Sequence, residues 1–351
     1  KNMLKVESLR ISITDKCNFR CIYCMPLYGV SFLEKKEILT YEEIITVVKV
    51  MKKLGVNKFR ITGGEPLIRK NLPQLIKMIS ELNVSDLSLT TNGFLLGVNE
   101  KLAYNLKEAG LKRINISLDT VNPSKFYQIN RPQNKLKISN LTISSNSQHT
   151  PEFQEIYLNT VIKGIKNCLK AGINNIKINT VLLNILTIQD ILKLIEFAVN
   201  NNLTIRFIEF MDTTPIFDPN LYISYEQVLN NLSKYVDIKE YDGKSIGEGP
   251  AKYYQIKLNN TTSLIGFIFN TLENCKKCNR IRLTSNGYIK ICIYQEDGYY
   301  IKDILRSNKN KEEIEEELEK VIKNALSIKE TGKINYNLFK KQSNYMFKVG
   351  G

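Results

Sequence analysis

Residues 40–62, TYEEIITVVKVMKKLGVNKFRIT, contain one predicted helix followed by one predicted strand. Thr40 and Glu43 have the spacing of a capping box at the start of the helix, and Gly55 stands where the apolar periodicity stops. The β-branched run at 58–62 is typical of a strand. A helix joined to a strand is the unit of parallel α/β folds, so the fold depends on whether this unit recurs.

The unit recurs between Ser8 and Met211. Further predicted helices end at Gly110 and Gly172, and Thr187 with Asp190 offers another N-terminal cap. This alternation requires right-handed crossovers and a parallel sheet, and six units form an open relative of the (β/α) barrel. In such a barrel the chemistry gathers at the carboxyl ends of the strands. The predicted strands are residues 8–14, 58–62, 87–91, 113–118, 176–182 and 205–210.

After Met211 the alternation stops. Further strands are predicted at 252–258, 263–269, 281–284 and 288–293, with a charged helix from 311 to about 327. We therefore predict an α/β fold, an open partial (β/α)6 TIM-like barrel with a smaller C-terminal α+β domain. The predicted domains are residues 1–220 and 221–351.

Residues 131–153, RPQNKLKISNLTISSNSQHTPEF, are rich in Asn, Ser, Thr and Gln and lack periodic apolar positions. We expect a disordered surface insertion between the fourth strand and its helix. It contains His149, the only histidine of the chain, to which we assign no role.

The composition limits the class of protein. The chain has 351 residues, 43% of them hydrophobic, which allows a sizeable core. No run of eighteen apolar residues suggests a membrane span. The net charge of +15 favours an anionic partner, such as nucleic acid, an acidic protein or a phosphorylated small molecule. A solvated basic surface is the alternative reading of the same charge.

Seven cysteines are too few for a disulfide scaffold at this length, and their clustering indicates metal ligands in a reducing compartment. Because position 1 is Lys and not Met, a lost targeting peptide stays open. We expect a cytoplasmic protein in a bacterium or a mitochondrial matrix protein in a eukaryote.

Three cysteines, Cys17, Cys21 and Cys24, follow the first predicted strand with the spacing C-x3-C-x2-C. A structural zinc site requires four ligands, and no fourth Cys or His lies nearby. Cys168 stands in an apolar helical stretch, which indicates a packed core thiol. Three thiolates and one open position suit a [4Fe–4S] cluster. A zinc knuckle completed by a remote residue is the alternative.

A second triad, Cys275, Cys278 and Cys292, lies in the predicted C-terminal domain. It again offers three ligands, so a second open cluster is implied.

Two motifs carry a resemblance to a known family. The segment CNFRCIYC, followed after the next strand by Gly63-Gly64-Glu65-Pro66, resembles the radical S-adenosylmethionine superfamily. With the second triad, the segment CNRIRLT and the terminal Gly350-Gly351, the chain resembles the GTP 3′,8-cyclase family of molybdenum cofactor biosynthesis. The resemblance covers nearly the whole chain except residues 131–153.

The resemblance implies a reaction. A 5′-deoxyadenosyl radical, generated at the first cluster, would remove hydrogen from the ribose C3′ of GTP. Attack on guanine C8 and reduction would give (8S)-3′,8-cyclo-7,8-dihydroguanosine 5′-triphosphate, in the first step of molybdopterin biosynthesis. The second cluster would hold the guanine.

The resemblance also assigns residues by position. Gly350, Gly351 and Arg10 would belong to the catalytic set, and the six cysteines of the triads would hold two [4Fe–4S] clusters. The S-adenosylmethionine site would be lined by Tyr23, Gly64, Ser117 and Met211. The GTP site would be lined by Arg10, Arg60, Thr91, Lys177, Arg206, Arg280 and Arg282. Arginine suits a triphosphate because its planar fork binds pairs of oxygens.

Partners follow from the same resemblance. They are GTP, an electron donor that is flavodoxin-like or another reductant, and the downstream cyclic pyranopterin monophosphate synthase. We expect neither nucleic acid nor membrane as a partner, and a homodimer is one assembly state left open.

Two departures from the family concern Asn274, where relatives commonly have Phe, and the tail NYMFKVGG, which lacks the usual Arg-Pro-Met lead-in. Two rival functions remain. One is a radical S-adenosylmethionine enzyme with an auxiliary cluster that acts on a peptide. The other is a non-catalytic zinc protein that binds nucleic acid.

Overall fold

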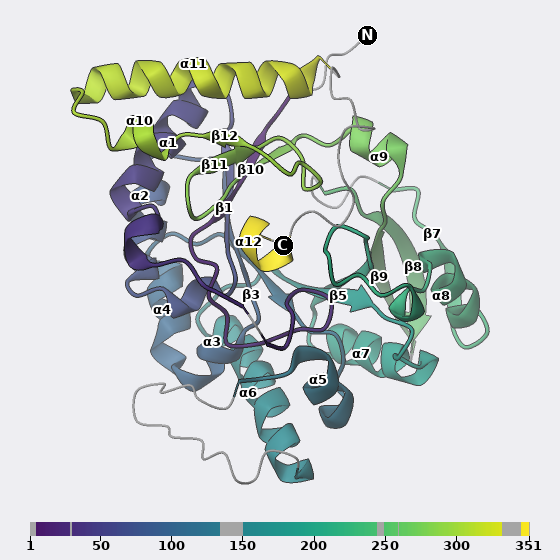
Figure 1. Cartoon of the computed structure of the whole chain (residues 1–351). Coiled ribbons are helices and arrows are strands. Elements are labelled where there is room, and N and C mark those ends of the chain that lie inside the picture. The colour runs from purple at the N-terminus through teal and green to yellow at the C-terminus, as the bar shows by residue number, and fades with distance from the viewer. Residues whose placement is uncertain are drawn as a thin grey trace.

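The computed structural model of the chain describes residues 5–28, 30–133, 150–243, 249–258, 260–331 and 345–350. Its central part is a run of six strands, each followed by helical structure, as the sequence predicts (Figure 1). Each strand begins within one residue of its predicted start. The strands are β1 (Ser8–Ser12), β2 (Lys58–Thr62), β3 (Asp86–Thr91), β4 (Arg113–Ser117), β5 (Ile176–Leu182) and β6 (Thr204–Glu209).

Helices cover the outer face of these strands (Figure 1). The first helix, α1, begins with a capping box: Thr40 Oγ1 accepts from the Glu43 N–H at 3.1 Å, and Glu43 Oε2 accepts from the Thr40 N–H at 2.7 Å. Its apolar face, which includes Ile44 and Val48, is buried. The remaining helices of this part repeat the arrangement. They are α1 (Tyr41–Lys53), α2 (Leu72–Ser80), α3 (Phe94–Val98), α4 (Glu100–Glu108), α5 (Pro123–Asn130), α6 (Pro151–Lys170) and α7 (Ile188–Asn200).

The C-terminal third contributes six more strands and five helices among the described residues. The predicted strands at 252–258, 263–269 and 281–284 are present, and the one at 288–293 is shorter because a turn begins at Ile291. The strands are β7 (Asp237–Glu240), β8 (Lys252–Leu258), β9 (Thr261–Ile268), β10 (Arg280–Leu283), β11 (Tyr288–Lys290) and β12 (Tyr299–Tyr300). The helices are α8 (Tyr225–Leu232), α9 (Leu272–Lys276), α10 (Lys302–Leu305), α11 (Lys311–Glu330) and α12 (Met346–Val349).

All twelve of these strands form one sheet, in the order β12-β11-β10-β1-β2-β3-β4-β5-β6-β9-β8-β7. Strands β1 to β6 are parallel neighbours, and the later part of the chain extends both edges: β10 pairs with β1 and β9 pairs with β6, each in parallel. The fold is therefore an open partial barrel whose two edges are continued by the C-terminal region. The division into domains 1–220 and 221–351 stays a prediction.

The predicted insertion at 131–153 is shorter than expected. Thr150 caps α6, and Phe153 in its first turn is 5% exposed, so the prediction of disorder is wrong for residues 150–153. Pro132 forms a bridge with Phe19, which places residue 132 against the first cysteine loop. Residues 134–149, His149 included, lie outside the described residues.

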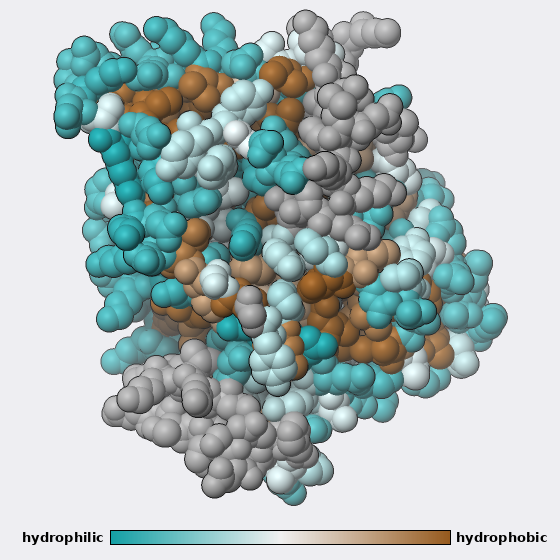
Figure 2. Space-filling model, viewed as in Figure 1, coloured by the Kyte–Doolittle hydropathy of each residue, from teal (hydrophilic) through white to brown (hydrophobic). Residues whose placement is uncertain are grey.

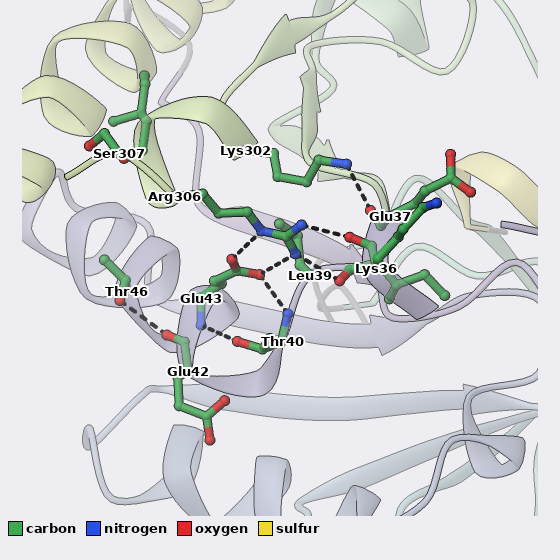
Figure 3. A network of polar contacts seen from close by, with 12 residues as sticks. Lys36, Glu37, Leu39, Thr40, Glu42, Glu43, Thr46, Lys302, Arg306 and Ser307 are labelled. Atoms are coloured by element: carbon green, nitrogen blue, oxygen red, sulfur yellow. Dashed lines mark hydrogen bonds and ion pairs between the residues drawn. The ribbon is translucent and has the colours of Figure 1, made fainter. Parts of the chain in front are cut away.

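A polar contact joins the C-terminal part to the first helix (Figure 3). The Arg306 guanidinium, just after α10, donates to both carboxylate oxygens of Glu43, at 2.7 and 3.1 Å, and to the carbonyl oxygens of Lys36 and Ile38. Glu43 is also the second half of the capping box of α1. The same carboxylate therefore caps a barrel helix and binds the chain that follows β12.

Among the described residues, none of the helices combines the length and the hydrophobicity that crossing a membrane requires.

Candidate active site

The inner face of the six parallel strands is unusually polar. Side chains alternate across a strand, so every second residue points to the same face. On β1 and β2, Leu9, Ile11 and Phe59 lie on the outer face and are buried, while Arg10 and Arg60 lie on the inner face opposite each other in the strand register. A barrel interior filled with charge instead of Val, Ile and Leu indicates a binding cavity.

The first cysteine triad lies on the loop after β1, at the carboxyl edge of the sheet. Cys17, Cys21 and Cys24 line one pocket and none is in a disulfide. Burial and the neighbouring thiols of the triad raise the pKa of Cys17 and of Cys24. Burial raises the pKa of Cys21 to about 12. Three adjacent buried thiols become thiolates readily only when a metal supplies positive charge, which is the chemistry of a cluster ligand set.

The Gly63-Gly64 pair packs against the cysteine loop. A Cβ on Gly64 would lie 2.3 Å from the Lys16 carbonyl oxygen, and one on Gly63 would lie 2.6 Å from that of Thr14. The Gly64 N–H donates to the Thr14 carbonyl at 2.7 Å. The glycines therefore allow the turn after β2 to fit against the backbone that leads into the triad.

The pocket beside the triad contains every residue assigned to S-adenosylmethionine. Its empty volume is about 1110 Å³, part of it open to solvent, which is ample for a cofactor of that size. Tyr23, Gly64, Ser117 and Met211 all line it. They come from the cysteine loop and from the ends of β2, β4 and β6, so the sequence-based grouping holds in space.

Asp119 organises one wall of this pocket and was not predicted from the sequence. It accepts from the Tyr23 hydroxyl at 2.8 Å, from Asn130 Nδ2 at 3.2 Å and from the Val181 N–H at 2.8 Å. Asn130 Nδ2 also donates to Cys21 Sγ at 3.3 Å. Burial raises the pKa of Asp119 to about 6, although these hydrogen bonds favour its charged form.

Glu65, of the Gly-Gly-Glu-Pro motif, organises the opposite wall. It accepts from the Thr91 hydroxyl at 2.7 Å and from the Asn92 N–H at 2.8 Å, and burial raises its pKa to about 7. Thr91, assigned to the substrate, therefore lies on the triad pocket with its hydroxyl bonded to Glu65.

A second pocket is lined by cations. Five of the seven residues assigned to GTP line it, and its empty volume is about 840 Å³, including space open to solvent. Its cations are Arg10, Arg60, Lys177, Arg206, Arg280 and Arg113, together with Lys58. Arg113, which the sequence analysis missed, forms an ion pair with Asp86. Because Lys58, Asp86 and Arg113 begin β2, β3 and β4, this pocket reaches toward the amino ends of the strands.

The cations of this pocket repel one another. Burial lowers the pKa of Arg10 and Arg60, and neighbouring guanidinium groups lower both further. Burial and Arg206 lower the pKa of Lys177 to about 8. Such a concentration of positive charge is stable when an anion shares the site, and it attracts one.

Neutral side chains hold the most buried guanidinium in place. Arg206, 5% exposed, donates to Asn179 Oδ1 at 2.8 and 3.0 Å and to Asn115 Oδ1 at 2.9 Å. Arg60 Nε donates to the Ser88 hydroxyl at 3.2 Å. Since these partners carry no charge, they orient the cations without neutralising them.

The two pockets are contiguous. Thr90, Asn179 and Ile208 line both. At this shared wall, Thr90 Oγ1 is buried without a hydrogen-bond partner among the described residues, so it is available to a ligand.

The second triad comes from α9, the segment that precedes β10, and the turn after β11. Burial raises the pKa of Cys275 and of Cys292, and neighbouring thiols of the triad raise both further. Burial raises the pKa of Cys278, but Arg280 and Lys329 outweigh it and bring the pKa down to about 6. A thiolate favoured at neutral pH is a prepared metal ligand.

Among the described residues, no three His, Cys, Asp or Glu side chains form a ready site for a single metal ion. A structural zinc ion needs four ligands at short distance, whereas each triad offers three thiols. The donor sets therefore fit iron–sulfur clusters with an open position better than zinc.

Helix α12 and Gly350 lie beside the carboxyl ends of β1 and β2 (Figure 1). Arg282, assigned to GTP, donates to the carbonyl oxygens of Val349 and Gly350. Gly350 has φ +75°, and a Cβ there would lie 2.5 Å from Thr62 Cγ2. Met346 lines the triad pocket. The tail reaches the site despite its unusual lead-in, and Gly351 lies outside the described residues.

Comparison with known proteins identifies two family models. The Radical SAM superfamily model matches residues 11–198, and the Molybdenum Cofactor Synthesis C model matches residues 203–333.

Among curated relatives, the GTP 3′,8-cyclase of Pelotomaculum thermopropionicum is 36% identical over 88% of both chains. The enzyme of the same name from Nautilia profundicola is 36% identical over 91% of both. That of Aliarcobacter butzleri is 37% identical over 91% of this chain and 90% of the relative.

Among solved structures, Streptococcus suis SuiB bound to S-adenosylmethionine superposes with a TM-score of 0.58 at 15% identity. The match covers 88% of this chain and 63% of SuiB, and at this identity it bears on the fold alone.

Proposed function

The chain belongs to the radical S-adenosylmethionine superfamily and to its GTP 3′,8-cyclases, and we propose that the residues described above carry out that cyclisation. It is an enzyme that uses a [4Fe–4S] cluster and S-adenosylmethionine. The substrate is GTP and the product is (8S)-3′,8-cyclo-7,8-dihydroguanosine 5′-triphosphate. This is the first step of molybdenum cofactor biosynthesis.

The shared wall of the two pockets carries the proposal. Hydrogen abstraction requires the reactive carbon of the cofactor beside the ribose, and a triphosphate requires cations. The triad pocket and the cationic pocket adjoin each other, because both are lined by Thr90, Asn179 and Ile208.

Cys17, Cys21 and Cys24 would hold the first cluster, and Tyr23, Gly64, Ser117 and Met211 would surround S-adenosylmethionine. With one electron, this cofactor pair supplies a 5′-deoxyadenosyl radical that removes hydrogen from unactivated carbon. Asp119 and Asn130 fix Tyr23 and Cys21 by hydrogen bonds, so the wall of the site is set before the cofactor arrives.

In the cationic pocket, Arg10, Arg60, Lys177, Arg206 and Arg280 would bind GTP. The composition of the product equals that of GTP. Hydrogen leaves C3′, a C3′–C8 bond forms, and one electron with one proton completes the reduced base.

The second triad, Cys275, Cys278 and Cys292, would hold a second [4Fe–4S] cluster that binds the guanine. The lowered pKa of Cys278 supports this role because it favours the thiolate. Arg282 would contribute to the substrate site by binding the carbonyl oxygens of the C-terminal tail. Gly350 and Gly351 would complete the site from that tail.

We also propose a flavodoxin-like protein or another reductant as the electron donor, since the reaction consumes electrons. The net charge of +15 suits an acidic carrier of that kind. The consumer of the product is cyclic pyranopterin monophosphate synthase. A reducing compartment keeps the thiols available, and a homodimer is one assembly to be tested.

The test uses anaerobically reconstituted protein. About eight irons per chain, as two four-iron clusters imply, are expected, with 5′-deoxyadenosine and an isomer of GTP formed only when reductant, S-adenosylmethionine and GTP are all present. Iron binding and cofactor cleavage with unchanged GTP would place the chain elsewhere in the superfamily. Zinc without cleavage would refute the proposal.

A further inference from the structure

Lys329 occupies a core position of an otherwise charged helix. Helix α11 presents hydrophilic residues outward over one edge of the molecule, with hydrophobic residues beneath them (Figure 2). Its buried face carries Leu318, Ile322, Ala325 and Leu326, and Lys329 continues the same spacing at 3% exposure. Lysine is rarely buried to this extent without a specific partner.

The ammonium of Lys329 contacts the second cysteine triad. Its Nζ lies 2.5 Å from the Ile291 carbonyl oxygen and 3.6 Å from Cys278 Sγ. Ile291 immediately precedes Cys292. One side chain thus touches the segments that carry two of the three ligands.

Among the described residues, no carboxylate hydrogen-bonds to the Lys329 side chain. In the part of the chain that the structure describes, the hydrogen bonds of Lys329 go to a neutral carbonyl and a thiol, and Glu330 next to it accepts instead from the Val6 N–H at 2.8 Å. A buried ammonium is costly unless an anion accompanies it. The thiolates of a metal centre at this triad supply that anion.

We propose that Lys329 is a positioning residue of the second cluster, whose charged amine donates to the Cys278 sulfur and holds the turn that carries Cys292. The inference deepens the proposed function and rests on the second cluster being present. Hydrogen bonds to cluster sulfurs and nearby positive charge favour the reduced state of a cluster. Lys329 therefore raises the reduction potential of this cluster.

The competing explanation is that Lys329 only anchors the last turn of α11 to the Ile291 carbonyl. The chain offers a matched control in Lys290, which is 6% exposed and donates to the carbonyl oxygens of Gln295 and Glu296 at 3.0 and 2.9 Å. Both are buried lysines near the same triad, but these two contacts of Lys290 are with carbonyl oxygens, whereas Lys329 contacts a cysteine.

The experiment uses full-length protein with the substitutions C17A, C21A and C24A. These remove the first triad, so that Cys275, Cys278 and Cys292 are the remaining cluster ligands. In this parent, K329M, K329R and K290M are reconstituted with iron and titrated by EPR spectroscopy for the midpoint potential. We expect a lower potential and altered EPR line shape in K329M, values near the parent in K329R, and no shift in K290M.

An unchanged potential and line shape in K329M, with iron retained, would overturn the inference and leave Lys329 a structural anchor. If K329M does not fold, K329Q keeps a donor without the charge and is expected to shift in the same direction. If K329M and K329Q fold but lose iron while K329R keeps it, the result would also support the inference, because cluster retention would then depend on the charge at position 329. A parent that binds no iron would instead refute the second cluster itself.

Discussion

The two cysteine triads are built from the same donor atoms but differ in the charged residues beside them. At the first, burial raises the pKa of Cys17 and Cys21, and the carboxylates of Glu65 and Asp119 add to this effect, while Arg20 partly opposes it at Cys17. At the second, burial raises the pKa of Cys275 and Cys292, but Arg280 and Lys329 lower that of Cys278 to about 6 in spite of burial. Spacing alone does not distinguish the triads, but their neighbours do.

The difference matches a division of labour. Negative surroundings disfavour an added electron and make a cluster a stronger reductant, whereas positive surroundings make it easier to reduce and attract an anion. In the proposed function, the first triad would therefore favour reductive cleavage of a cofactor, and the second would favour binding of an anionic substrate.

The largest effects are expected when one cysteine is removed from each triad. C21A is expected to abolish both 5′-deoxyadenosine and the cyclised product, because the cluster that cleaves the cofactor is lost. C278A should lose the product but keep cofactor cleavage at the first triad. Product analysis by mass spectrometry with iron counting measures both.

The control for this pair is C168A. Cys168 is fully buried in the core, so the variant should keep its iron and activity and lose only some stability. Equal loss of cofactor cleavage in C278A and C21A would contradict the separate roles of the triads.

Loss of a cation from the cationic pocket should have the next largest effect. R206M removes a guanidinium that is oriented by Asn115 and Asn179, and we expect GTP affinity to fall about 10- to 100-fold, each tenfold corresponding to about 1.4 kcal/mol. R206K should recover only part of it, because an ammonium lacks the planar fork. Equilibrium binding of GTP to the reconstituted enzyme measures the change.

K309A serves as the control, since Lys309 is a cation outside the pocket that pairs with Glu317. An R206M enzyme that melts like the parent and binds GTP equally well would remove the cationic pocket from the substrate site.

The sequence predicts most of the fold because hydrophobic periodicity and caps are local signals. The six parallel strands begin within one residue of expectation, and Thr40 with Glu43 caps α1 as predicted. What periodicity does not contain is pairing between distant segments. The parallel pairing of β9 with β6 and of β10 with β1, which extends the barrel sheet at both edges, depends on tertiary packing.

The site is predicted less evenly. The cysteines and arginines carry motifs, and the structure brings most of them into two adjacent pockets. Asp119, Asn130 and Arg113 were missed because each acts through a partner distant in sequence. One signal was available: polar residues at alternate positions of strands otherwise rich in Ile and Leu, as at Arg113, Asn115 and Ser117, indicate an inner face that binds a ligand.

A smaller effect is expected from pH. Burial and Arg206 lower the pKa of Lys177 to about 8, so its ammonium loses its proton as the pH rises through that value. GTP affinity of the free enzyme should then fall several-fold between pH 7 and pH 9, and K177R should flatten this dependence because its guanidinium stays charged. Binding titrations across this range measure it, and the same slope in K177R would assign the dependence to another group.

The sign for stability is the reverse. Between the folded pKa of about 8 and the unfolded value of 10.5, the unfolded chain binds more protons at Lys177, so this residue makes the protein more stable as the pH rises. If the affinity for GTP falls with pH while the contribution of Lys177 to stability rises, the loss of affinity cannot be explained by unfolding.

The smallest effect should come from the contact that joins the segment after β12 to the barrel. R306A removes a guanidinium that binds Glu43 and two carbonyl oxygens on the surface, and pairs of this kind contribute about 1 kcal/mol or less. Because α11, which carries Lys329, begins at Lys311, shortly after Arg306, the loosened segment should lower iron retention at the second triad before the first. Urea unfolding combined with the EPR signals of both clusters tests this, and K309A is the control, since Lys309 pairs with Glu317 within the same segment. Equal loss of both signals in R306A would mean that the two triads share one unit of stability and differ in charge alone.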